Sequence, residues 1–228
     1  MSVMLRAGTD TRVGVRAQST PQRTCEDRRV TASAPPVARS PKATRFLAPL
    51  GLLALMWAIQ FADAVLPGTF VGWGLRSWDL GSLQGLVLGP LLHASWTHLI
   101  GNSVPFLILG CLVAVEGARR FWLVTAMVAL VGGAGTWLLN APGTLTVGAS
   151  VLVFGYFGYV VLRVIAPGRL AHRIAYAGIA VIVIVLYGTT VLTGIFGAGP
   201  GVSWQAHLFG AIGGGLVAFI GRRRDPAA

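Results

Sequence analysis

The chain has 228 residues, of which 54% are hydrophobic and only 11% charged, and its mean hydropathy is +0.72. Soluble globular domains carry about 25% charged residues, so this composition excludes an ordinary water-soluble domain. The net charge of +11 would suit a nucleic-acid-binding protein, but 12 charged side chains gather within residues 1–45. The remaining basic residues form small clusters between apolar runs, which is typical of the cytoplasmic loops of a membrane protein.

Three regions follow from this distribution. Residues 1–45 mix Ser, Thr, Pro, Ala and Arg without apolar periodicity, which predicts a disordered basic cytoplasmic tail. Residues 46–221 form the predicted membrane domain. Residues 222–228 form a short basic cytoplasmic end.

The membrane domain contains six candidate spans. A spanning helix needs about 20 mostly apolar residues, and the stretches that meet or approach this length are 46–66, 97–115, 121–140, 149–166, 174–192 and 204–221. Residues 67–96 are apolar but interrupted by Gly, Pro and Trp, which predicts an interfacial loop with short helices. The predicted fold is therefore an all-α bundle of six transmembrane helices.

The arginines predict the orientation of these spans. If the tail is cytoplasmic, 17 basic residues fall on the inner side and only Arg76 falls on the outer side. Positive residues are concentrated in cytoplasmic loops, so we expect both termini inside. A chain rich in Arg, Ala, Gly and Val and poor in Lys is typical of a GC-rich bacterial genome, and we expect a bacterial inner membrane.

This topology brings several polar residues to one depth. The second, fourth and sixth spans all start at the outer side, where they carry His98, Asn102, Ser150 and His207. At 1.5 Å per residue, Ser150 lies about 20 Å above Arg163. Polar groups inside a membrane are costly and normally face the bundle interior or a water-filled cavity.

These side chains suit acyl transfer. An imidazole can take the proton of a serine hydroxyl during attack and return it to the leaving amine, so Ser150 and His207 are a candidate dyad. His98 and Asn102, at i and i+4, share a helix face, and the Ser150 amide opens a helix. Together these donors could stabilise an oxyanion.

The helix faces predict close packing around the dyad. His207 shares a face with Gly210 and Gly214, whose G-x-x-x-G spacing lets a neighbouring backbone approach. Phe154 lies one turn below Ser150, where its ring could support the imidazole.

Three motifs in this order closely resemble the rhomboid family of intramembrane serine proteases. They are His93-x4-His98-x3-Asn102, Gly148-Ala149-Ser150 and Ala206-His207-x2-Gly210-x3-Gly214. Glu116 also resembles the acidic position of the family at the inner end of the second span. The resemblance covers about residues 46–221.

The resemblance implies a Ser150 and His207 dyad without an aspartate, and an oxyanion site formed by His98, Asn102 and the Ser150 amide. It implies single-pass membrane proteins as substrates, cut at small residues near a destabilised segment. It implies no metal and no organic cofactor. The oligomeric state stays open.

The chain departs from the family pattern at three places. Val151 stands where the family usually has Gly, and Phe154 stands where it often has Tyr. The Trp-Arg pair that is common in the first outer loop is missing. We expect Val151 to flank the contact between Ser150 and His207, and Val151→Gly to raise turnover or leave it nearly unchanged by relieving crowding.

Other interpretations remain open. A rhomboid-like pseudoprotease would bind membrane proteins without cutting them. Val151 is the one feature in its favour, whereas the presence of Ser150, His207, His98 and Asn102 together argues against it. A small transporter would be expected to show broken spans or an internal repeat, and the sequence shows neither. A metal site could use His93, His98 and His207, although we expect His93 to hydrogen-bond the outer loop.

Overall fold

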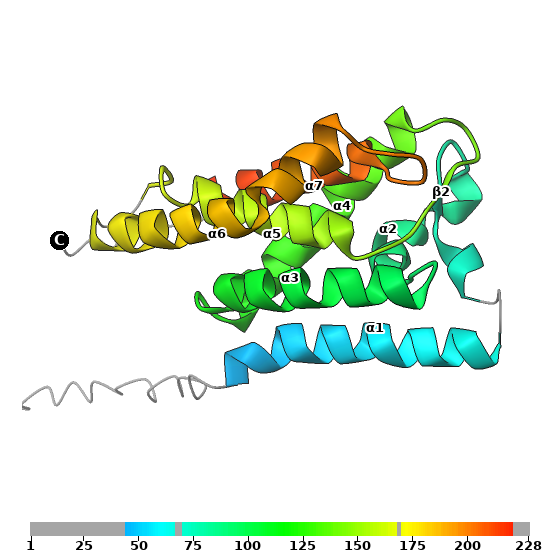
Figure 1. Cartoon of the computed structure of the whole chain (residues 1–228), viewed down its shortest axis with the longest axis horizontal. Helices are drawn as coiled ribbons and strands as arrows, with labels where there is room; N and C mark the ends of the chain where they lie inside the picture. Colours follow the sequence, from blue (N-terminus) through cyan, green and yellow to red (C-terminus); the bar gives the residue numbers. More distant parts are fainter. Residues whose placement is uncertain (1–43, 67–69, 168–169, 221–228) are drawn as a thin grey trace, which may run out of the picture. The chain divides into compact units, whose positions relative to one another are not determined.

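The computed structural model describes residues 44–66, 70–167 and 170–220, so the predicted tail up to residue 43 and residues 221–228 lie outside the described part. Its long helices coincide with the six predicted stretches and confirm a mainly helical chain: α1 (Leu47–Val65), α3 (Trp96–Ala114), α4 (Ala118–Leu139), α5 (Ser150–Leu162), α6 (Leu170–Phe196) and α7 (Trp204–Phe219). Figure 1 shows α3 lying between α1 and the remaining helices.

Four of these helices are long and apolar enough to cross a membrane. They are the helical run Thr44–Val65, which contains α1, together with α3, α4 and α6. The chain is therefore a multi-pass membrane protein. α5 and α7 have 13 and 16 residues, fewer than predicted. At the end of α7, arginine side chains bind the backbone carbonyls, Arg163 at Ala218 and Arg120 at Val217 and Ile220.

The predicted interfacial loop is broken into short elements, as expected from its Gly and Pro content. They are η2 (Val71–Trp73), β1 (Leu75–Arg76), η3 (Leu80–Ser82), α2 (Gly85–Leu88) and η4 (Gly89–Leu91). β1 pairs antiparallel with β2 (Leu145–Thr146), with Leu75 opposite Thr146. This two-stranded ribbon ties the loop to the segment that leads into α5.

The core is centred on α5, in which nine of 13 residues are buried. Three glycines bring its backbone close to that of α7. A Cβ on Gly214 would overlap the carbonyl of Gly155, and one on Gly210 would lie 2.5 Å from the carbonyl oxygen of Val151. A Cβ on Gly158 would likewise overlap the backbone of α7. Small residues permit this kind of close helix contact inside a membrane.

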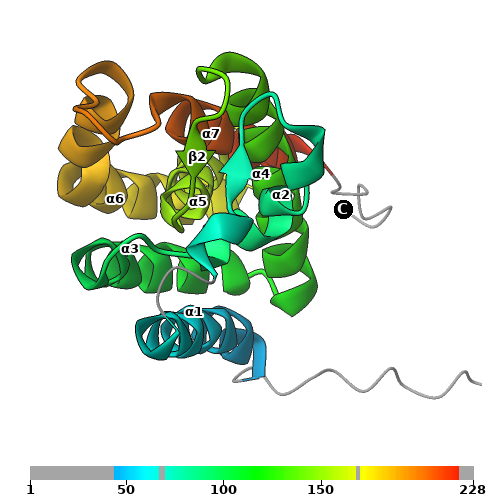
Figure 2. The same cartoon turned by 90° about the vertical axis from the view of Figure 1, so that its right-hand side faces the viewer.

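α6 is packed far less tightly than α5. Only three of its 27 residues are buried, Tyr176, Ala180 and Val183, and none lies beyond its midpoint. Figure 2 shows α6 at one edge of the helices, beside α5 and α3. The C-terminal half of this long helix is therefore held by few contacts.

Candidate active site

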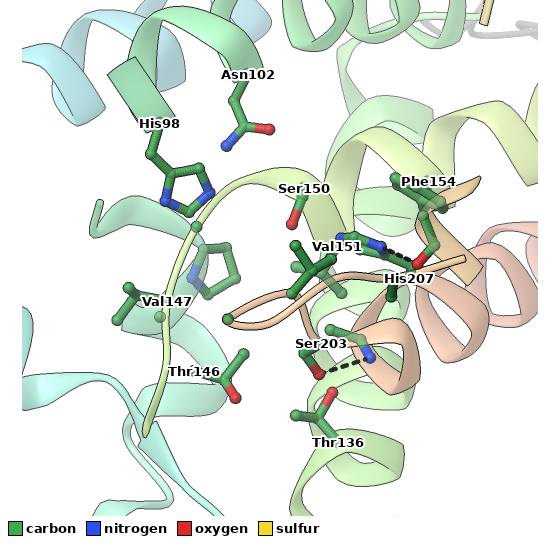
Figure 3. A pocket seen from close by; sticks show the side chains of 18 of the residues that line it. His98, Asn102, Thr136, Thr146, Val147, Ser150, Val151, Phe154, Ser203 and His207 are labelled. Carbon is green, nitrogen blue, oxygen red and sulfur yellow. Dashed lines mark hydrogen bonds between the residues drawn. The ribbon is translucent and has the colours of Figure 1, made fainter. Parts of the chain in front are cut away.

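A cavity of about 770 Å³ lies among the N-terminal ends of α3, α5 and α7, the C-terminal end of α6 and the segment that precedes α5. Ser150, His207, His98, Asn102 and Phe154 all line it. Figure 3 shows the Ser150 hydroxyl with the His98 and His207 rings on either side of it. Side chains from three helices that are far apart in sequence thus face one space.

Ser150 is the first residue of α5. The chain turns just before it. Gly148 makes this turn with φ of +119°, and the His98 ring occupies the place where its Cβ would lie. Within the described residues, neither the Ser150 hydroxyl nor its backbone N–H has a hydrogen-bond partner. Both groups are therefore available to a molecule in the cavity.

His207 is held in one orientation by two contacts. Its ring stacks on Phe154 with centroids 3.9 Å apart and an angle of 10° between the planes. Its Nδ1 lies 2.9 Å from the carbonyl oxygen of Gly194. Because a carbonyl only accepts hydrogen bonds, Nδ1 carries the hydrogen, and Nε2 of the neutral ring is left as an acceptor.

Asn102 contributes an unsatisfied donor. Its side chain is buried, and its Nδ2 has no hydrogen-bond partner in the described part of the chain. A buried donor without a partner is costly, and it is satisfied when an acceptor occupies the cavity. His98 lies one turn earlier on α3, so both side chains project from the same face.

A model of the rhomboid domain matches residues 80–224, which include Ser150, His207, His98 and Asn102. The chain belongs to the rhomboid family. The motif-based resemblance is thus confirmed at the level of the family.

Relatives of this rhomboid come from several bacteria. It is 31% identical to an uncharacterized protein of Mycobacterium tuberculosis (strain H37Rv) over 75% of this chain and 72% of the relative. It is 35% identical to an uncharacterized protein of Mycobacterium leprae over 75% and 69%. It is 31% identical to the Bacillus subtilis protein named "Putative rhomboid protease YdcA" over 75% and 85%.

Glu116 lies away from this cavity, in the turn between the end of α3 and the start of α4. Its carboxylate accepts hydrogen bonds from Arg163 Nε at 2.9 Å and from the Tyr176 hydroxyl at 2.6 Å. Burial alone would raise its pKa, but the bonds from Arg163 and Tyr176 hold the pKa of Glu116 below its usual value. Its hydrogen bonds thus link the turn after α3 to the end of α5 and to α6 in this rhomboid.

Val151 lies where α4, α5 and α7 meet. It is 7% exposed, and one of its methyl groups fills the place of a missing Cβ at Gly132 of α4. The room for a branched side chain is therefore supplied by the neighbouring helix. This changes the expectation for Val151→Gly, because the substitution would open a void and relieve no crowding.

His93 binds the backbone immediately before the serine. The N–H of Ala149 donates to His93 Nε2 at 3.3 Å, and the His93 and His98 rings meet edge to face at 5.1 Å. Burial and the neighbouring His98 lower the pKa of His93 to about 4. The three histidines of the alternative metal site form no group positioned to hold a metal ion among the described residues.

Gly194 and Gly132 did not stand out in the sequence. Gly194 acts through its backbone carbonyl, which every residue type has, and only the missing side chain hints at a close approach. Gly132 is one of several glycines in its span, and its partner Val151 depends on the rotation of α4 relative to α5. The common signal was a glycine inside an apolar helix, which usually has a packing or functional reason.

Proposed function

We propose that this rhomboid is an intramembrane serine endopeptidase. Ser150 is the nucleophile and His207 the general base and acid. His98, Asn102 and the Ser150 amide bind the oxyanion, and the substrates are single-pass membrane proteins. The proposal also includes six spans, with α5 and α7 as the two short ones, both termini in the cytoplasm and a place in a bacterial inner membrane.

The chemistry follows from the groups in the cavity. Ser150 Oγ attacks the carbonyl carbon of the scissile peptide bond while its proton moves to His207 Nε2. The negative charge on the carbonyl oxygen is stabilised by the donors of Asn102, His98 and the Ser150 amide. The imidazolium then protonates the leaving amine, and a water molecule hydrolyses the acyl-enzyme by the same sequence of steps.

The proposal rests on the tautomer of His207. Its Nδ1 is engaged by a carbonyl, which leaves Nε2 as a proton acceptor in the same cavity as a free serine hydroxyl. The free Asn102 amide adds an oxyanion donor. A protein that only bound its clients would have no use for this combination.

The test is labelling by a fluorophosphonate probe combined with cleavage of a model transmembrane substrate in proteoliposomes. Labelling and cleavage should both occur in the wild type and both be lost in Ser150→Ala. Ser103→Ala is the matched control, because Ser103 lies on α3 outside the cavity. Its hydroxyl accepts a hydrogen bond from Trp57 Nε1. Asn102→Ala should slow cleavage by about 10² to 10³, the usual loss for one oxyanion donor.

Two results would contradict the proposal. Cleavage by Ser150→Ala would exclude this serine as the nucleophile. A folded wild type that neither labels nor cleaves would favour the pseudoprotease, which binds membrane proteins without cutting them.

A further inference from the structure

The Gly194 carbonyl connects the proposed general base to α6. Gly194 lies near the outer end of this helix, 13 positions before His207, and its oxygen is the acceptor for His207 Nδ1. In soluble serine proteases a carboxylate holds the equivalent nitrogen and fixes the tautomer of the ring. Here the partner is a backbone group, so it moves whenever the helix moves.

The glycine at this position permits the contact. A Cβ on Gly194 would lie 2.6 Å from Phe154 Cζ and 3.0 Å from His207 Nδ1. A side chain would therefore push α6 away from the stacked Phe154 and His207 rings. Gly194 also lines the cavity, so the bond lies at the site itself.

The outer half of α6 has little else to hold it. From residue 184 to its end the helix contains no buried residue, and Tyr187, Val191 and Ile195 pack only partly against the core. Behind this face lies a second cavity of about 230 Å³ bordered by α3, α5 and α6. Dispersion contacts are lost where a cavity replaces neighbouring atoms.

Hydrogen bonds from α6 to other helices are also unequally distributed. Near the inner end, the Tyr176 hydroxyl donates to Glu116. In the outer half, the side-chain hydrogen bonds of the described residues are those of Thr193 to its own helix and the bond between His207 and Gly194. The imidazole is thus the polar anchor of the outer half of α6.

We infer that Gly194 is a positioning residue for His207, and that this hydrogen bond couples the outer end of α6 to the base. With α6 docked, Nδ1 is engaged and Nε2 faces the cavity. With α6 displaced, the ring loses the partner that fixes its tautomer and the base is switched off. The coupling deepens, and so rests on, the proposed function, but the contact itself can be measured without any activity.

The experiment measures α6 by spin-label distances in the full chain in nanodiscs, with Cys25 and Cys111 replaced by alanine. Labels at Ile100 and Phe196 report the outer end, and labels at Trp122 and Ile174 report the inner end; all four side chains are exposed. His207→Ala should lengthen and broaden the distribution of distances between the labels at Ile100 and Phe196, called the outer distance. It should leave the distance between the labels at Trp122 and Ile174, called the inner distance, unchanged. Ser150→Ala, which keeps the imidazole, should change neither.

Two further variants separate the role of His207 as an anchor for α6 from its role as the general base. In His207→Asn, Nδ2 takes the place of Nδ1 and can still donate to Gly194, so the outer distance should be preserved although cleavage is lost. Gly194→Ala should displace α6 and reduce cleavage by about 10²-fold, the scale expected when a catalytic group is misplaced by about 1 Å. Gly178→Ala is its matched control on the same helix, because a Cβ there meets nothing within 4 Å.

The outcomes are distinct. Unchanged outer distances in both His207→Ala and Gly194→Ala would overturn the coupling and leave the dyad intact. Cleavage by Ser150→Ala would instead overturn the proposed function without affecting the measured distances. A variant of His207 that fails to fold still leaves Gly194→Ala as the deciding measurement.

Discussion

Val151 and Gly132 form a complementary pair at the residue scale. The Val151 methyl group takes the place of a Cβ on Gly132, so a larger residue at either position affects the other. The departure from the family pattern beside the nucleophile is therefore accommodated by an absent side chain on α4. In a close-packed interior such pairs keep the total volume constant.

We predict that Gly132→Ala lowers the free energy of unfolding by about 1–3 kcal/mol, the usual range for overpacking. Val151→Ala should also destabilise, because it leaves a cavity. The double variant Gly132→Ala with Val151→Ala should be more stable than the sum of the two losses implies. Denaturation in mixed detergent micelles measures all three; strictly additive losses would show that the two side chains do not share this space.

His93 predicts a dependence of stability on pH. Its pKa is about 4 in the folded protein and 6.5 without burial, so the unfolded chain binds more protons between these values. The free energy of unfolding should therefore fall as the pH decreases from about 7 to 4, by about 3 kcal/mol from this group alone.

Thermal unfolding from pH 7.5 to 4 checks this dependence. His93→Gln is the control, because its side-chain oxygen can still accept from the Ala149 N–H without titrating. The variant should lose most of the decrease, and an equal decrease in both proteins would assign it to other groups.

At the scale of elements, neighbouring arginines at the start of α4 have unequal roles. Arg120 donates to the carbonyls of Val217 and Ile220 at 2.7 and 2.8 Å and to the Tyr159 hydroxyl at 2.9 Å, whereas Arg119 is exposed. The guanidinium of Arg120 thus holds the C-terminal end of α7 through two of its carbonyls.

We predict that Arg120→Ala destabilises the protein by about 2–3 kcal/mol, since hydrogen bonds that involve a charged group are worth about 1.5–3 kcal/mol. Arg119→Ala removes the same charge from the same turn and should stay within about 0.5 kcal/mol of the wild type. The midpoints of thermal unfolding of both variants give the comparison. Equal losses would mean that Arg120 acts by charge alone.

The positions of the helices could be predicted from the sequence because each apolar run is bounded by polar or glycine-rich segments. The start of α5 at Ser150 and of α7 at Trp204 follow from such boundaries. The length of α6, from Leu170 to Phe196, exceeds the prediction at both ends because residues outside the apolar window continue the helix. The Gly194 contact could not be predicted, since it depends on a backbone atom and the tilt of α6.

At the scale of the whole molecule, the charge distribution predicts which side of the membrane each loop faces. We expect reporter fusions after residues 143 and 198 to be exterior, and fusions after residues 118, 168 and 224 to be cytoplasmic, because basic residues stay on the cytoplasmic side. Alkaline phosphatase and green fluorescent protein fusions in a bacterial host measure this pattern. A reversed or shifted pattern would remove the common depth of Ser150 and His207.

The close α5–α7 contact and the loosely packed α6 together predict the order in which the helices separate during unfolding. Contacts between backbones at Gly214 and Gly155 leave no gap into which a detergent chain can insert. α6, with three buried residues, and α1, also with three, present most of their surface to the surroundings. Regions with few buried contacts open first, so the peripheral helices should detach early, and the segment α4 to α5 with α7 should persist as a residual folding unit.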